Sequence, residues 1–191
     1  MPKAPTLRSE LAEGRNPMDP GRVCALTETF LSEPGQASRL IEFLWDDDAG
    51  VASRAADVLE RVTRGDSETG KRIFSRSKEA LLGLLQEAGP KKLRWNLALM
   101  VGRLPLTPKE ARRAAMVLES WLDDASSIVK TAALQGLADL IRHAPASLPG
   151  VLDLLRIQGR SGTPAMRARS RILLLGLEKR QRSNRGESRI E

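Results

Sequence analysis

The sequence has few aromatic residues, one cysteine, one histidine and no long hydrophobic run. Its 191 residues include three Trp, three Phe and no Tyr, so leucine and alanine must supply most of the core. A single cysteine cannot form an internal disulfide, and one histidine adds no convincing metal-ligand set. No stretch approaches the roughly 18 apolar residues of a membrane-spanning helix, and the start lacks the apolar segment of a secretory signal. We therefore expect a cytoplasmic protein without a cofactor, a metal or a membrane association.

Charge is unevenly distributed along the chain, whose formal net charge is +7. Residues 1–69 carry 8 Lys/Arg against 13 Asp/Glu, a net charge of −5, whereas residues 70–191 carry 23 against 11, a net charge of +12. A basic C-terminal half is typical of proteins that bind nucleic acid, another polyanion or an acidic protein surface. The same charge also serves solubility, and composition does not decide between the two interpretations.

Proline, glycine and polar stretches divide the chain into segments. We expect residues 1–17 to be a flexible N-terminal arm, residues 18–180 to form one helical domain, and residues 181–191 to be a basic disordered tail. Thr107-Pro-Lys-Glu110 has the sequence of a capping box that opens a helix. No segment shows the alternation of a β-strand over a useful length, so the pattern predicts an all-α fold.

A pattern of twelve residues occurs four times in the chain. Its copies begin at Val51, Leu93, Val129 and Met166, so successive copies start 42, 36 and 37 residues apart. When each copy is numbered from zero, apolar residues fall mainly at positions 0, 4, 7, 8 and 11, which share one face of a helix. Periods of this length are typical of stacked helical pairs that bury their apolar faces against their neighbours. We predict about four helical hairpins and an additional N-terminal helix.

This pattern resembles the HEAT repeat of the armadillo-like proteins, in which an acidic turn precedes a helix with a base near its start. Leu122-Asp-Asp-Ala-Ser-Ser-Ile-Val-Lys130 is the best match, and the resemblance covers about residues 36–178. It implies a right-handed α-solenoid whose second helices line a binding face. Because the base of such repeats commonly pairs with the turn acid, the resemblance makes Asp123 or Asp124 the expected partner of Lys130.

The candidate binding surface combines bases near the start of each copy with residues expected to point away from the core. Position 1 of the copies carries Arg94, Lys130 and Arg167, which would form a basic stripe across successive hairpins. Trp95 is interpreted either as an outward anchor for a ligand or as a wedge between hairpins. The candidate surface comprises Lys91, Lys92, Arg94, Trp95, Leu99, Gln135, Arg167, Arg169, Arg171 and Ile172. For Arg167 and Arg171, which lack a local acidic turn, we expect free surface charge.

Three further residues are expected in the interior. Trp45 and Trp121 lie at matching helix ends before acidic turns, and we interpret both as core residues. Cys24 is also interpreted as buried, because free cysteine behaves as a small hydrophobic residue.

Two functional hypotheses follow. The first is a non-enzymatic scaffold that binds a protein partner on the concave face of a short HEAT-like solenoid. The alternative is a nucleic-acid-binding protein that uses the basic C-terminal half, similar in fold to the HEAT-like DNA-alkylation-repair glycosylases. That family places an acid near aromatic residues, but Leu99 follows Trp95 by one turn here, so the resemblance carries no catalytic residue. An enzyme similar to the HEAT-like bilin lyases is a third, weaker hypothesis without a residue that supports it. The oligomeric state is left open.

Overall fold

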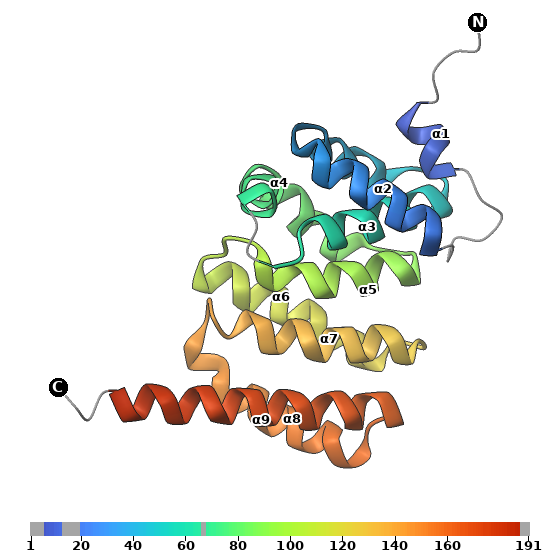
Figure 1. The fold of residues 1–191 in the computed structure, drawn as a ribbon. Helices are drawn as coiled ribbons and strands as arrows, with labels where there is room; N and C mark the ends of the chain where they lie inside the picture. The colour runs from blue at the N-terminus through green and yellow to red at the C-terminus, as the bar shows by residue number, and fades with distance from the viewer. Residues whose placement is uncertain (1–5, 13–19, 66–67, 188–191) are drawn as a thin grey trace, which may run out of the picture. The chain divides into compact units, whose positions relative to one another are not determined.

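The computed structural model describes residues 6–12, 20–65 and 68–187, and in these ranges it contains helices and no strand (Figure 1). The predicted all-α fold is therefore confirmed. The α-helices are α1 (Leu7–Ala12), α2 (Pro20–Ser32), α3 (Ala49–Val62), α4 (Glu68–Glu87), α5 (Lys91–Met100), α6 (Pro108–Ser120), α7 (Ser127–Leu140), α8 (Leu148–Ser161) and α9 (Pro164–Glu187). The 3₁₀ helices are η1 (Pro34–Trp45), η2 (Val101–Arg103), η3 (Trp121–Asp123) and η4 (Pro145–Ser147).

The helix starts follow local sequence signals. Several helices begin with proline, which fits the first helical position because its missing N–H would have no intrahelical partner there. At α6 the Thr107 hydroxyl accepts a hydrogen bond from the Glu110 N–H at 3.3 Å, and the Glu110 carboxylate accepts one from the Thr107 N–H at 2.7 Å. The predicted capping box is therefore confirmed. At α3 the Asp48 carboxylate caps the helix by accepting from the N–H groups of Gly50 and Val51.

The chain forms two compact units, Met1–Pro105 and Leu106–Glu191. In the first unit, α3 is the central helix and packs on α1, α2, η1 and α5. Leucine, valine and alanine fill this core, as the shortage of aromatic residues predicts, and Leu40, Val51, Ala55 and Leu59 are fully buried. The core of this unit is therefore organised around one face of α3.

The second unit is built from two helical hairpins. Helix α6 packs on α7, α8 packs on α9, and α7 also packs directly on α9 (Figure 1). The core lies between α7, α8 and α9, where Leu134, Leu155, Met166 and Leu177 are buried. Leu173 and Leu174 cover the same cluster and are themselves partly buried.

The four copies of the sequence pattern lie on equivalent helices. They fall on α3, α5, α7 and α9, which are the second helices of the pairs η1–α3, α4–α5, α6–α7 and α8–α9. The second helices also contact each other within each unit, α3 with α5 and α7 with α9. Each unit thus contains two consecutive copies of the pattern in contact.

Part of the expected flexible arm is a folded helix, so that expectation is wrong for residues 7–12; residues 1–5 and 13–17 lie outside the described residues. Leu11 of α1 is fully buried, and the buried Arg54 of α3 donates hydrogen bonds to the carbonyl oxygens of Leu11 and Ala12. Arg8 also forms a two-point ion pair with Asp46, at 2.7 and 2.8 Å. A six-residue helix has too little sequence periodicity to be predicted, because its stability comes from these tertiary contacts.

The ion pair of α1 also affects the charge state of Asp46. The hydrogen bond from Arg8 and a second one from the Asp48 N–H stabilise the ionised carboxylate, and they lower the pKa of Asp46 below its usual value. Asp46, the first residue of the acidic turn between η1 and α3, therefore holds α1 in place through Arg8.

Three interpretations of single residues and one boundary are also corrected. Trp45 is 46% exposed, because it ends η1 and faces outward at the turn. Trp121 is only partly buried. Cys24 is exposed, since the buried face of α2 is formed by Val23 and Leu26 instead. The expected disordered tail is helical at its start, since α9 continues to Glu187.

Candidate interaction surface

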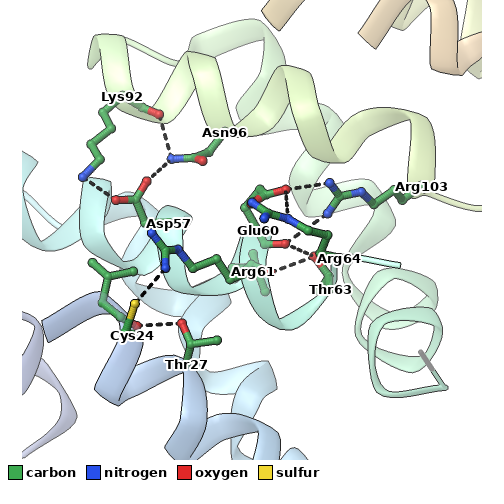
Figure 2. A network of polar contacts seen from close by, with 12 residues as sticks. Cys24, Thr27, Asp57, Glu60, Arg61, Thr63, Arg64, Lys92, Asn96 and Arg103 are labelled. Carbon is green, nitrogen blue, oxygen red and sulfur yellow. Dashed lines mark hydrogen bonds and ion pairs between the residues drawn. The ribbon is translucent and has the colours of Figure 1, made fainter. Parts of the chain in front are cut away.

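The main polar network of the first unit connects α3 with the following hairpin (Figure 2). Asp57 of α3 forms an ion pair with Lys92 of α5, and it accepts a hydrogen bond from the Asn96 Nδ2 at 2.7 Å. The side chains of Lys92 and Asp57 are only 11% and 14% exposed. Lys92, a member of the candidate surface, therefore makes an internal contact.

Glu60 lies one turn further along the same face of α3 and is 4% exposed. Its carboxylate bonds to Arg64 at 2.5 Å and to Arg103 at 2.6 Å, and Arg103 also donates to the Glu60 carbonyl at 3.0 Å (Figure 2). Burial by itself raises the pKa of Glu60, but the hydrogen bonds from both arginines outweigh it and leave the pKa lowered. Both acids of α3 are thus paired, and their arrangement stabilises the contact between helices.

Arg61 extends this network to α2. Its Nη1 donates to the Cys24 sulfur at 3.1 Å (Figure 2). A solitary exposed thiol with one such contact does not form a catalytic pair, because no base lies beside it within the network drawn.

The other candidate residues of the first unit lie on α5. Lys91 is exposed, whereas Trp95 and Leu99 are partly buried. Arg94 donates hydrogen bonds to the carbonyl oxygens of Gly89 and Ala88, in the turn that precedes its own helix. The guanidinium therefore satisfies backbone acceptors of that turn.

The second unit repeats this arginine contact and brings two other candidates together. Arg167 donates to the Gly162 carbonyl oxygen at 2.8 Å, five residues earlier, as Arg94 does to Gly89. The expectation of a free charge at Arg167 is wrong, because the turn before α9 offers an unpaired carbonyl. Arg169 donates to the Gln135 Oε1 at 3.3 Å and links α9 to α7.

The expected pairing of Lys130 with Asp123 or Asp124 stays a prediction. The Asp124 carboxylate accepts a hydrogen bond from the Ser126 N–H at 2.7 Å, next to the start of α7. The turn acids satisfy backbone N–H groups at helix starts, which have no partner within the helix.

An apolar stripe flanked by arginines runs along the solvent side of α9, and we call these residues the outer face of α9. Ile172 and Leu175 are 62% and 71% exposed, although both are large and apolar. At about 100° per residue, the exposed Ala168 and Gly176 lie on the same stripe, opposite the buried residues of the helix. Exposed arginines flank the stripe on both sides, namely Arg169 and Arg180 on one side and Arg171 and Arg182 on the other.

Sequence reasoning selected Ile172 but missed Leu175, the more exposed of the two. The run from Ile172 to Leu175 is entirely apolar, and hydrophobicity alone does not separate its inward and outward members. The register of the pattern does indicate that Leu175 faces outward, because Leu175 falls at position 9, outside the apolar positions 0, 4, 7, 8 and 11. Register therefore identifies the outer face better than composition does.

A cavity of about 220 Å³ lies between α1, α2 and η1. Leu7, Leu26 and Phe30 provide apolar walls, and Glu10 and Glu33 add carboxylates. This volume is below the roughly 300–1,000 Å³ of pockets that hold drug-sized ligands. Within the residues described, no cluster of His, Cys, Asp or Glu is placed to hold a metal ion. None of the described helices combines the length and apolar character needed to cross a membrane.

No family model and no curated protein matches the sequence. Among solved structures, the chain is similar to the crystal structure of an engineered protein, a Northeast Structural Genomics Consortium target. The TM-score is 0.62 and the sequence identity 16%, over 90% of this chain and 79% of that chain. At this identity the likeness supports the fold alone.

Proposed function

We propose that the protein is a non-enzymatic interaction module that binds a protein partner through the outer face of α9. The observation that carries this proposal is the exposure of Ile172 and Leu175 side by side on a helix of a folded unit. Exposing such a pair to water is unfavourable, and contiguous apolar surface with a polar rim is characteristic of protein-binding sites. The flanking arginines supply that rim.

The apolar centre favours protein over nucleic acid as the partner. A surface that follows phosphates needs bases along its middle, because neutralised phosphates provide most of the affinity. On α9 the arginines flank the stripe; its centre holds Ile172 and Leu175, and Lys179 is the single base that follows them on it, one turn after Leu175. Arg171 and Arg182 would then contact acidic side chains at the edge of a protein interface.

We further propose that the four helical pairs are HEAT-like hairpins of one right-handed solenoid in a cytoplasmic protein. The support is the placement of every copy of the pattern on the second helix of a pair. The contacts of α3 with α5 and of α7 with α9 add to it, because second helices of consecutive repeats pack together in such arrays.

The test is affinity capture from lysate with matched variants of the full chain. We expect Ile172→Gln with Leu175→Gln to abolish recovery of any partner bound through the outer face of α9. Glutamine keeps a high helix propensity, so the helix itself should be preserved. The control is Ile157→Gln on α8, which replaces an equally large side chain that is 58% exposed.

Each outcome has a definite meaning. Equal recovery with the wild type and the double variant would refute the use of this face. If labelled duplex DNA binds at low salt and its affinity falls when Arg171 and Arg182 become glutamine, the nucleic-acid alternative replaces the proposal. Circular dichroism of all three proteins establishes that they are equally helical.

A further inference from the structure

The contacts between successive copies follow the same register in both units. In the first unit, Asn96 at position 3 of its copy donates to Asp57 at position 6 of the preceding copy. In the second unit, Arg169 at position 3 donates to Gln135 at position 6 of the preceding copy. In the first and third copies, position 6 is therefore the place that contacts the next second helix.

Position 9 is covered by the next copy in the same way. Glu60 is paired with Arg103 of the following copy, and Ala138 belongs to the core cluster that includes Leu173 and Leu177 of α9. Glu60 and Ala138 are each only 4% exposed. Positions 6 and 9 thus mark the side of a second helix that is buried by its successor.

In the fourth copy, the described residues leave the same two positions uncovered. They are Ile172 and Leu175, the exposed residues of the outer face of α9. The exposed side of α9 is therefore apolar, and it has the register with which α3 accepts α5 and α7 accepts α9.

Gly176 lies on the exposed stripe of α9 beside Ile172. A Cβ atom at this glycine would meet nothing within 4 Å, so the fold of the second unit does not require a glycine there. Glycine inside a helix costs about 0.5–1 kcal/mol relative to alanine. Together with Ala168, it lowers the surface beside Ile172 and Leu175 and permits a close approach of another backbone.

The charge of α9 selects the kind of helix that would dock. The helix carries seven Lys/Arg and two Asp/Glu, a net charge of +5. A second α9 from another copy of the chain would bring like charges together, which disfavours a symmetric pairing. A helix with an apolar stripe and acidic flanks would instead pair its carboxylates with Arg169, Arg171, Arg180 and Arg182.

We propose that the outer face of α9 binds one acidic amphipathic helix of a partner protein, in the register with which α7 accepts α9. This inference rests on the proposed function and specifies its binding mode. The partner helix takes the place of a fifth second helix: its apolar residues cover Ile172 and Leu175, and its acids face the flanking arginines.

The experiment measures fluorescence anisotropy of three labelled 18-residue peptides against the full chain. The first is an amphipathic helix with a leucine stripe and glutamate flanks, the second has lysine at every glutamate position, and the third is the first with two central prolines. We expect the acidic helix to bind about tenfold or more tightly than either of the others. Its affinity should fall as salt is raised.

Variants connect the binding to the outer face. Ile172→Gln with Leu175→Gln should lower the affinity for the acidic helix about tenfold. Ile157→Gln should leave it unchanged. Equal affinity for the acidic and lysine peptides, or equal affinity for the helical and proline peptides, would overturn the inference. So would dimerisation of the chain that is abolished by the double variant.

Failure of the inference and failure of the proposed function give different results. If lysate capture depends on Ile172 and Leu175 but the acidic helix neither binds nor competes, the face binds protein in another mode. If capture is also independent of these residues, the proposed function fails with it.

Discussion

Equivalent positions of the first and last copies differ in chemistry and in burial. On α3, positions 6 and 9 are Asp57 and Glu60, which are acidic and paired with the following copy. On α9 the same positions are Ile172 and Leu175, which are apolar and exposed. The two acids of α3 thus have partners in the following helical pair, whereas the two apolar residues at the same positions of α9 are left exposed.

The comparison shows that charge in this protein has two roles. Lys92 and Arg103 hold two consecutive copies together inside the first unit. Because each is paired with a carboxylate, they add little to the attraction between the protein and an acidic partner. Arg171 and Arg182 lie on the surface of the last helix. The excess of basic residues in the C-terminal half therefore divides into a structural part and a part available to a partner.

The largest expected effect is the loss of the buried carboxylate. Glu60→Ala leaves Arg103 beside a buried backbone without its partner, and we expect it to destabilise the protein by about 2–3 kcal/mol. The estimate is at the low side of buried ion pairs because Arg64 is 65% exposed and regains water. Urea denaturation followed by circular dichroism measures the change, and a loss below 0.5 kcal/mol, roughly the effect of an ordinary surface substitution, would contradict it.

Protonation removes the same interaction without a mutation. The pKa of Glu60 is lowered from its ordinary value of 4.5, so its contribution to the free energy of unfolding is fully present above that pH. It is lost as pH falls through the lower, folded-state pKa. We therefore expect the stability difference between the wild type and Glu60→Gln to shrink below about pH 4.5. A difference independent of pH from 7 to 3 would show that charge at this position is unimportant.

A smaller effect is expected at position 6 of the same copy. Asp57→Asn keeps the size of the side chain and its hydrogen-bond acceptor for Asn96, but it removes the ion pair with Lys92. We expect a loss of about 1–2 kcal/mol, because both side chains are largely buried. Denaturation midpoints of the single and double variants at Asp57 and Lys92 measure the coupling energy.

The smallest effect has the opposite sign and separates stability from binding. Gly176→Ala should stabilise the second unit by about 0.5–1 kcal/mol, because the added methyl group meets no neighbour and restrains the unfolded chain. The same change should weaken docking of the acidic helix, since the methyl group lies beside Leu175. Thermal denaturation of this variant measures its stability, and peptide titration measures its affinity for the acidic helix. A lower stability than that of the wild type would contradict the open environment of Gly176.

The helical fold was predictable because its signals are local. Proline and glycine mark the helix ends, and the capping box at Thr107 and Glu110 defines one start at the level of single residues. The apolar spacing of the four copies predicted helices, and the copies begin on α3, α5, α7 and α9. These features depend on neighbours in the chain, which the sequence contains explicitly.

The contacts of single side chains were less predictable because they depend on residues far along the chain. The partners of Asp57 lie 35 and 39 residues further along the chain, and Arg103 lies 43 residues from Glu60, so the sequence alone predicted a surface position for Lys92. The position of Trp45 at a helix end before an acidic turn predicted a core residue, whereas the end of η1 turns it outward. Charge and hydrophobicity indicated which residues matter, and only the fold indicated which face each one takes.

The contact of Glu60 with Arg103 has a consequence for the way this sequence can change over time. Arg103 bonds to both the carboxylate and the carbonyl oxygen of Glu60, so a substitution at either position alone breaks the contact between the two helical pairs and leaves Glu60 or Arg103 with fewer partners. Substitutions at the two positions should therefore arise together in related chains, either as a reversed ion pair or as an apolar pair of similar volume. Residues at positions 60 and 103, which belong to the first and second copies of the pattern, would then vary together among related sequences.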